Sequence, residues 1–116
     1  MVKESPRIED GVIKWYCGDA FYISFEVLDD ETGAPLKMSD SDSITISFFN
    51  RQNVCVKQFV FGSDCDCSVL DCHIDEAVTK QFAVGVYTYC IKYHQGSVGT
   101  IATVKAVGKC EVERCH

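Results

Sequence analysis

Apolar and polar residues alternate along five segments of this chain. These segments are residues 21–28, 43–49, 54–61, 86–93 and 100–104. Because successive side chains of a β-strand point to opposite faces, each segment predicts a strand with one buried and one wetter face. Strands at such short intervals, separated by turn residues, are typical of an all-β sandwich or a small barrel.

Further segments complete the pattern. They are residues 12–17, the weaker segment 65–74, and 109–113; residues 100–104 belong to a longer segment, 99–107, which a break at Gly108 separates from 109–113. Together the segments predict one all-β domain over residues 12–116, a β-sandwich of seven to eight mostly antiparallel strands. Residues 1–11 are largely polar and charged, so we expect them to form a flexible N-terminal arm.

One segment favours a helix instead of a strand. Asp75 can cap its N-terminus, and Val78 and Phe82 are spaced i, i+4, so they would share one helix face. We therefore expect one short helix near residues 75–82, directly before the strand at 86–93.

Charge and composition narrow the classes of partner. The chain has 116 residues, 47% of them hydrophobic, and a net charge of −6. Its 11 basic residues are scattered, whereas nucleic-acid-binding proteins present a basic patch, so nucleic acid is not an expected partner. The first residues lack the apolar core of a signal peptide, and no apolar run reaches the ~18 residues of a membrane span. We expect a cytoplasmic protein that does not bind a membrane.

The eight cysteines of the chain admit two interpretations. In a small secreted domain they would form disulfides, but a reducing cytoplasm keeps thiols free, and free thiols are the expectation here. Cys17, Cys55 and Cys90 lie in apolar strand-like segments, where a buried thiol behaves as a small apolar side chain.

Two segments share the spacing Cys-x4-Cys-His, and they begin at Cys67 and Cys110. Thiolate and imidazole groups are the ligands that zinc prefers. A zinc or redox site would draw on Cys65, Cys67, Cys72, His73, Cys110, Cys115 and His116. The usual zinc knuckle has a tighter spacing, and in a continuous strand Cys67 and Cys72 would face opposite sides. Zinc is therefore the alternative to a protein without a cofactor.

No catalytic signature is present in the sequence. It lacks glycine-rich phosphate-binding motifs, the nucleophile elbow and the HExxH motif. Cys90 and His94 would share a strand face but lie roughly 13 Å apart, at ~3.3 Å per residue. The adjacent Cys72 and His73 would point to opposite faces, and the acidic turns match no EF-hand loop. We expect a protein that is not an enzyme.

Three tyrosines on one face of the strand at 86–93 form a candidate interface. They are Tyr87, Tyr89 and Tyr93. Tyrosine is favoured at interfaces, although aromatic residues on a strand also cover a core. Trp15 is expected to lie in the core. An antibody-type immunoglobulin domain is disfavoured, because Trp15 precedes every cysteine and Thr88 lies two residues before Cys90.

Several turn and strand motifs follow one another in a recognisable order. They are Gly18-Asp19-Ala20-Phe21, the turn with Gly33 and Pro35-Leu36, and residues 42–48, 75–82, 85–91 and 108–112. In this order they resemble the N-terminal domain of baseplate upper proteins, and related immunoglobulin-like tail or neck modules, of phages and prophages. The resemblance implies an immunoglobulin-like β-sandwich that serves as a structural and docking module without catalytic residues. The eight cysteines are unusual for such a module, which keeps the zinc interpretation open.

We therefore expect a non-enzymatic structural or docking protein of a phage or prophage particle. It would be cytoplasmic when synthesised, would enter a virion, and would bind other structural proteins of the particle or form a homo-oligomer. The first alternative is a small cytosolic zinc-binding or redox domain that uses the Cys and His residues above. A bacterial adhesion or carbohydrate-binding module is a third interpretation, which the missing export signal disfavours.

Overall fold

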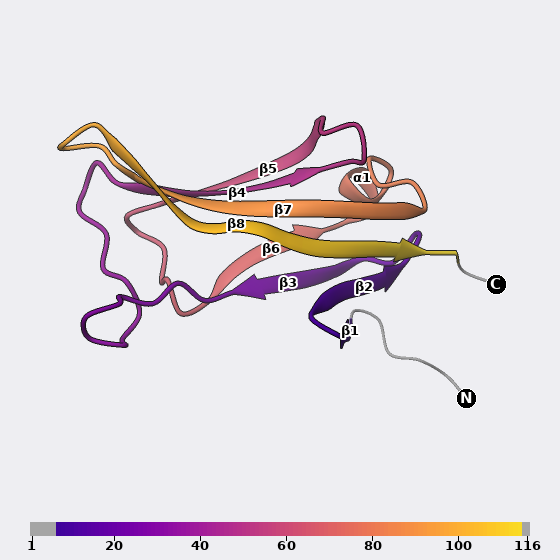
Figure 1. Ribbon diagram of the computed structural model, residues 1–116, viewed down its shortest axis with the longest axis horizontal. Helices are drawn as coiled ribbons and strands as arrows, with labels where there is room; N and C mark the ends of the chain where they lie inside the picture. The colour runs from indigo at the N-terminus through magenta and orange to yellow at the C-terminus, as the bar shows by residue number, and fades with distance from the viewer. Residues whose placement is uncertain (1–6, 115–116) are drawn as a thin grey trace.

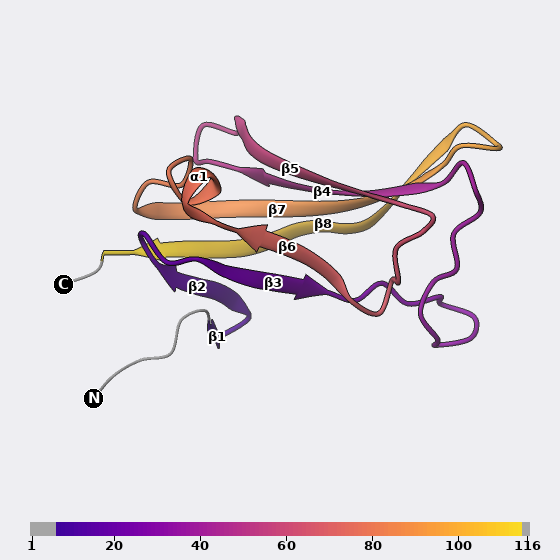
Figure 2. The same cartoon turned by 180° about the vertical axis from the view of Figure 1, so that it is seen from behind.

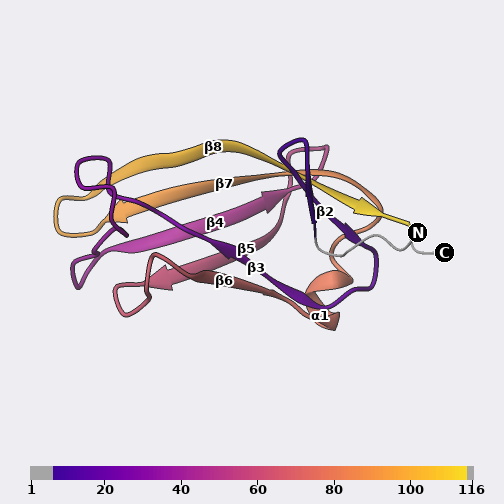
Figure 3. The same cartoon turned by 90° about the horizontal axis from the view of Figure 1, so that it is seen from below.

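The computed structural model describes residues 7–114, and two β-sheets pack against each other in it (Figure 1). The large sheet contains β1 (Arg7–Glu9), β2 (Val12–Tyr16), β4 (Ser43–Phe49), β5 (Cys55–Gly62), β7 (Gly85–Gln95) and β8 (Thr100–Glu113). Its strand order is β1-β2-β8-β7-β4-β5. The small sheet pairs β3 (Phe21–Phe25) with β6 (Leu70–Ile74), and β3 crosses in front of the large sheet when seen from below (Figure 3).

The all-β prediction is confirmed, with eight strands over residues 7–114. Neighbouring strands are antiparallel except for β2 and β8, which are parallel and pair Val12 with Lys109 through to Tyr16 with Glu113. The mostly antiparallel pairing also agrees with the prediction.

The core lies between the two sheets. Alternate side chains of β4, from Ile44, Ile46 and Phe48, are fully buried, as their spacing predicts. They face apolar side chains of the small sheet, among them Ile23 and Leu70. Burying a side chain of this size contributes about 1.5–3 kcal/mol to stability. The apolar inner faces of the two sheets therefore determine how the sheets stack.

Trp15 lies in this core with no exposed surface, as predicted. Its ring makes edge contacts with the rings of Phe21 and Phe82, at centroid distances of 5.4 and 5.6 Å. Phe82 follows helix α1 (Glu76–Thr79), so these contacts close one end of the sandwich.

The predicted helix is present but shorter than expected. The Asp75 carboxylate accepts a hydrogen bond from the Val78 amide at 3.0 Å and caps α1. The helix ends at Thr79, and the Phe82 amide instead donates to the Thr79 carbonyl in a turn. The turn brings the Phe82 side chain into the core, which explains the early end of the helix.

The expected N-terminal arm differs from the structure over residues 7–11. Arg7–Glu9 forms β1 and pairs with β2 through a two-residue turn at Asp10-Gly11. Both turn residues have positive φ, 53° and 78°, which is the backbone of a tight type I′ hairpin. Residues 1–6 lie outside the described part of the chain.

Three strand boundaries also differ from the prediction. The strand predicted over residues 21–28 ends at Phe25, where its pairing with β6 stops, although Val27 remains buried. The weak strand expected from residue 65 begins only at Leu70. The predicted break at Gly108 is absent, since β8 runs through it as one strand that pairs with β7.

The distal half of the β7–β8 hairpin projects beyond the small sheet (Figure 2). Residues 100–107 of β8 are exposed, whereas Cys110 and Val112 further along the strand are buried. Two register shifts interrupt its pairing with β7, next to Ile91. Within residues 7–114, no helix has the length and apolar character that crossing a membrane requires.

Candidate interaction site

The tyrosines predicted as an interface lie on the inner face of β7. Tyr87 is 6% exposed, and its hydroxyl donates to the Ala83 carbonyl at 2.7 Å. The Tyr89 ring contacts the rings of Phe25 and Phe48. Burial raises the pKa of both phenols. Their shared face is therefore turned to the core, and we assign no open contact surface to Tyr87 or Tyr89.

Tyr93, the third tyrosine, is half-buried near the end of the core. Its hydroxyl donates to the Asp42 carboxylate at 2.6 Å. This hydrogen bond raises the pKa of Tyr93, and together with the Ser39 amide it lowers the pKa of Asp42. Asp42 is 6% exposed, so the pair fixes the loop before β4 to the distal part of β7.

The predicted zinc ligands occupy different environments. Cys72 is buried, whereas the adjacent His73 is exposed on the opposite face of β6. Burial raises the pKa of the Cys72 and Cys110 thiols to about 12. No group of three or more His, Cys, Asp or Glu side chains within residues 7–114 is placed to hold a metal ion. Cys115 and His116 lie outside the described residues.

The other cysteines correct one expectation. Cys17 and Cys55 are exposed and Cys90 is half-buried, although their apolar neighbours predicted burial. Cys17 follows the last residue of β2, and Cys55 begins the edge strand β5, so each lies at a margin of the large sheet. All cysteines between residues 7 and 114 are free thiols, and Cys67 is buried with Cys72 and Cys110.

A groove of about 200 Å³ adjoins the open edge of β3. Its lining residues are Arg7, Ile8, Ile13, Tyr22, Ile23 and Ser24. They come from β1, β2 and β3 and not from β6, so the groove lies on the side of β3 that has no paired strand within residues 7–114. We call it the β3 groove.

The outer face of the small sheet carries a stacked pair of rings beside the β3 groove. Tyr22 and His73 face each other across β3 and β6 at a centroid distance of 4.4 Å and an angle of 12°. Tyr22 keeps 60% of its surface exposed. In the next cross-strand pair on the same face, the Ser24 hydroxyl donates to the Asp71 carboxylate. These contacts hold the Tyr22 ring as a wall of the groove.

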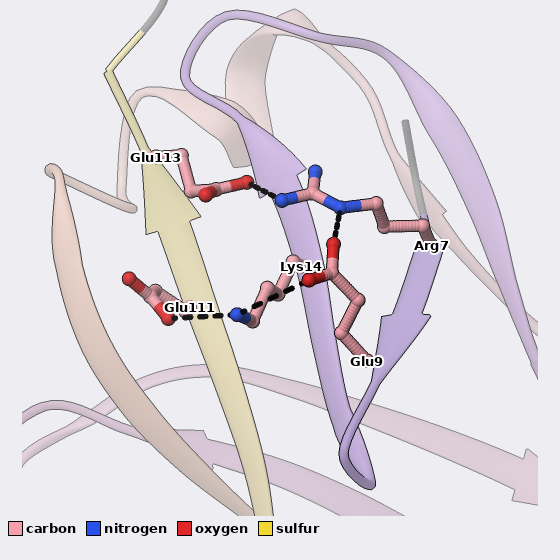
Figure 4. A network of polar contacts seen from close by, with 5 residues as sticks. All are labelled: Arg7, Glu9, Lys14, Glu111 and Glu113. Atoms are coloured by element: carbon pink, nitrogen blue, oxygen red, sulfur yellow. Dashed lines mark hydrogen bonds and ion pairs between the residues drawn. The ribbon is translucent and has the colours of Figure 1, made fainter. Parts of the chain in front are cut away.

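The opposite wall of the β3 groove is held by a network of ion pairs (Figure 4). The Arg7 guanidinium binds Glu9 on its own strand and Glu113 of β8, the latter at 2.5 Å. Lys14 of β2 lies 3.9 Å from Glu9 and 3.7 Å from Glu111 of β8. The Arg7 side chain is only 10% exposed, and hydrogen bonding to Glu9 raises its pKa, so it remains charged. The network ties β1 to β2 and β8.

Sequence reasoning did not find the β3 groove. Its residues come from two separate segments of the chain, 7–13 and 22–24, which alternation alone does not bring together. One signal was present in the sequence: Tyr22 is a large aromatic residue at a position that the pattern of residues 21–28 assigns to the polar face.

Comparison with known proteins gives no relative, because no family model, curated protein or solved structure matches this chain. Its function is therefore inferred from its residues and their arrangement.

Proposed function

We propose that this chain is a non-enzymatic structural and docking protein of a phage or prophage particle that acts through protein–protein contacts. One observation carries the proposal: the projecting β7–β8 hairpin exposes apolar side chains at Val98, Ile101 and Val107 to 65%, 61% and 59%. Single exposed apolar residues are ordinary, but several on one projecting hairpin favour a contact with another protein.

The arrangement of the strands supports the resemblance to immunoglobulin-like tail modules. The order β8-β7-β4-β5 with β3 and β6 opposite corresponds to strands G, F, C and C′ facing B and E of an immunoglobulin variable layout. The bond from Tyr87 to the Ala83 carbonyl has the form of a tyrosine corner at the start of strand F. Tyr89 then takes the position of the second immunoglobulin cysteine, and its ring contact with Phe25 takes the place of the disulfide.

The test is whether the chain enters a particle. In a bacterial host that produces the particles, the chain would carry a small tag, and particles would be purified on a density gradient and analysed by mass spectrometry. We expect the chain in the particle at a fixed ratio to the other structural proteins. Its absence from purified particles would overturn the proposal.

Two matched variants connect incorporation to the hairpin. Ile101→Lys places a charge on the projecting hairpin, and Val60→Lys places the same charge on β5, where the side chain is 64% exposed. We expect I101K to fold and to be lost from particles by at least tenfold, and V60K to be incorporated like the unaltered chain. Equal incorporation of both variants would contradict a role for the hairpin.

A further inference from the structure

The open strand edges of the molecule are not equally protected. Natural sheets guard their edges with charges, bulges or short strands, because an unguarded edge pairs with any available strand. The open part of β8 has Lys105 and two register shifts, the edge strand β5 has Lys57, and β1 has Arg7 and Glu9. β6 has Asp71 and His73.

Within residues 7–114, the edge of β3 has no charge and no register shift, and its one guard is its length of five residues. Its sequence from Phe21 to Phe25 is Phe-Tyr-Ile-Ser-Phe, without a charge or a proline. Its pairing with β6 is regular, from Phe21 with Ile74 to Phe25 with Leu70, without a register shift. An uncharged edge with regular pairing is the kind that accepts an added strand.

The β3 groove lies beside this edge and is sized for a side chain. Its volume of about 200 Å³ is below the ~300–1,000 Å³ of small-molecule sites. Ile8, Ile13 and Ile23 provide apolar walls, and the Tyr22 ring provides an aromatic one. Strand addition combines backbone pairing at an edge with pockets for alternate side chains, and this edge offers both.

The charges around the edge favour a basic occupant. Glu26 follows β3, and Asp71 lies across from Ser24 on β6, one strand away from the open edge; both are exposed, and neither belongs to an ion pair within residues 7–114. Arg7 is already bound by Glu9 and Glu113. A second copy of the chain would bring a further net charge of −6, which opposes self-pairing here.

We propose that the open edge of β3 accepts an extended basic segment of a partner protein as an added strand, with one large apolar side chain seated in the β3 groove. This inference rests on the proposed docking function and adds a second contact surface to the projecting β7–β8 hairpin. A single added strand of this length buries less area than the ~800 Å² per partner of a standard interface. Its affinity is therefore weak unless other contacts join it.

The probe is a peptide with alternating residues, acetyl-Lys-Ile-Lys-Val-Lys-Ile-Lys-amide, titrated into the ¹⁵N-labelled full chain and followed by NMR. We expect saturable shifts of the amides of residues 21–25, together with Ile8 and Ile13 in the β3 groove. A peptide with glutamate in place of lysine is expected to give no shifts, because Glu26 and Asp71 repel it.

Backbone pairing is tested with two N-methylated peptides, one methylated on its apolar residues and the other on its central lysines. The amides of alternate residues point to opposite edges of a strand, so strand addition predicts that one of these peptides binds and the other does not. Equal binding of both would overturn pairing with β3.

The matched protein variants are Ser24→Lys on the edge of β3 and Thr103→Lys on the open edge of β8. We expect S24K to weaken peptide binding at least tenfold and T103K to leave it unchanged. Ile8→Lys, at a side chain that is 74% exposed, repeats the test if S24K does not fold. The reverse pattern, with loss in T103K alone, would move the site to β8 and overturn the inference.

Self-association is the other outcome that decides the occupant. A dimer in sedimentation velocity that S24K abolishes would mean that a second copy, not a basic partner, occupies the edge, and would overturn the inference. Peptide binding by a chain that is absent from particles would leave this inference intact and remove only the particle function. A chain that is present in particles and binds no peptide would do the opposite.

Discussion

Gly108 of β8 lies directly beneath the ring of Tyr89 on β7. The two residues are paired across the strands, and a Cβ at Gly108 would lie 2.0 Å from Cζ of Tyr89. The Tyr89 ring cannot move away easily, because it packs against Phe25 and Phe48. A glycine opposite an aromatic residue is thus a packing partner in a continuous strand, and not a strand break.

The first prediction concerns this contact. Gly108→Ala is expected to destabilise the protein by about 1–3 kcal/mol, because the added methyl group overpacks the ring of Tyr89. Urea denaturation followed by circular dichroism measures the change. In a Tyr89→Ala background, Gly108→Ala should change the free energy of unfolding little. An equally large change there would mean that the backbone conformation of residue 108, and not the ring of Tyr89, causes the loss.

The second prediction concerns the bond between Tyr87 and Ala83. Tyr87→Phe keeps the buried ring and removes the hydroxyl that donates to the Ala83 carbonyl. We expect a loss of about 1 kcal/mol in the free energy of unfolding, the usual net value of one hydrogen bond. Tyr22→Phe, at the exposed ring stacked on His73, is the control and should leave the free energy unchanged. A similar loss in both variants would contradict the assignment.

The third prediction is a dependence of stability on acid through Asp42. Hydrogen bonds from Tyr93 and Ser39 hold the pKa of Asp42 below its ordinary value of 3.8 in the folded state. As the pH falls, the Asp42 carboxylate therefore takes up a proton in the unfolded state before it does so in the folded state. The stabilisation is fully present above pH 3.8 and is lost as the pH falls through the lower pKa of the folded state. Asp42→Asn should flatten the slope of unfolding free energy against pH in this range.

The matched variant for Asp42 is Tyr93→Phe. It keeps the carboxylate but removes the first of its hydrogen-bond donors, so it should reduce the acid slope without abolishing it. Chemical denaturation at a series of pH values, from neutral pH down to the acid transition, measures the free energy of unfolding of the unaltered chain and of both variants. An unchanged slope in Asp42→Asn would mean that other carboxylates carry the acid sensitivity.

The fourth prediction concerns the order in which the thiols react. Burial raises the pKa of Cys72 and Cys110 to about 12, whereas Cys17 and Cys55 are exposed. At pH near 8 we expect iodoacetamide to modify the exposed pair well before Cys72 and Cys110, because the thiolate is the reactive form and burial disfavours it. Peptide mapping by mass spectrometry measures each site. Denaturant should equalise the rates, and early modification of Cys72 in the native protein would contradict the buried placement.

Local features of the fold could be read from the residues in order. The alternation of Ile44, Ile46 and Phe48 predicts a strand and its buried face, because side chains of a strand alternate whatever it pairs with. Asp75 predicts a helix start for a similar reason, since a cap involves only the next few residues. The end of α1 was missed, because the turn after it is imposed by burial of Phe82.

At the candidate site, the sequence pattern does not predict which side chains are exposed to solvent. Spacing placed Tyr87 and Tyr89 on one face of a strand, but whether that face meets solvent or core depends on the small sheet above it. The Cys72–His73 pair was separated correctly onto opposite faces, whereas the exposure of Cys17 and Cys55 followed from their places at the margins of the sheet.

Alternation, turn residues and caps act within a few positions of the chain, so the residues specify an all-β chain, most of its strands and its short helix without reference to the rest. The parallel pairing of β2 with β8, the open edge of β3 and the groove between residues 7–13 and 22–24 are different. They arise when segments far apart in the chain bury a common apolar face. Side-chain packing and the entropy of closing long loops determine which of many possible pairings forms.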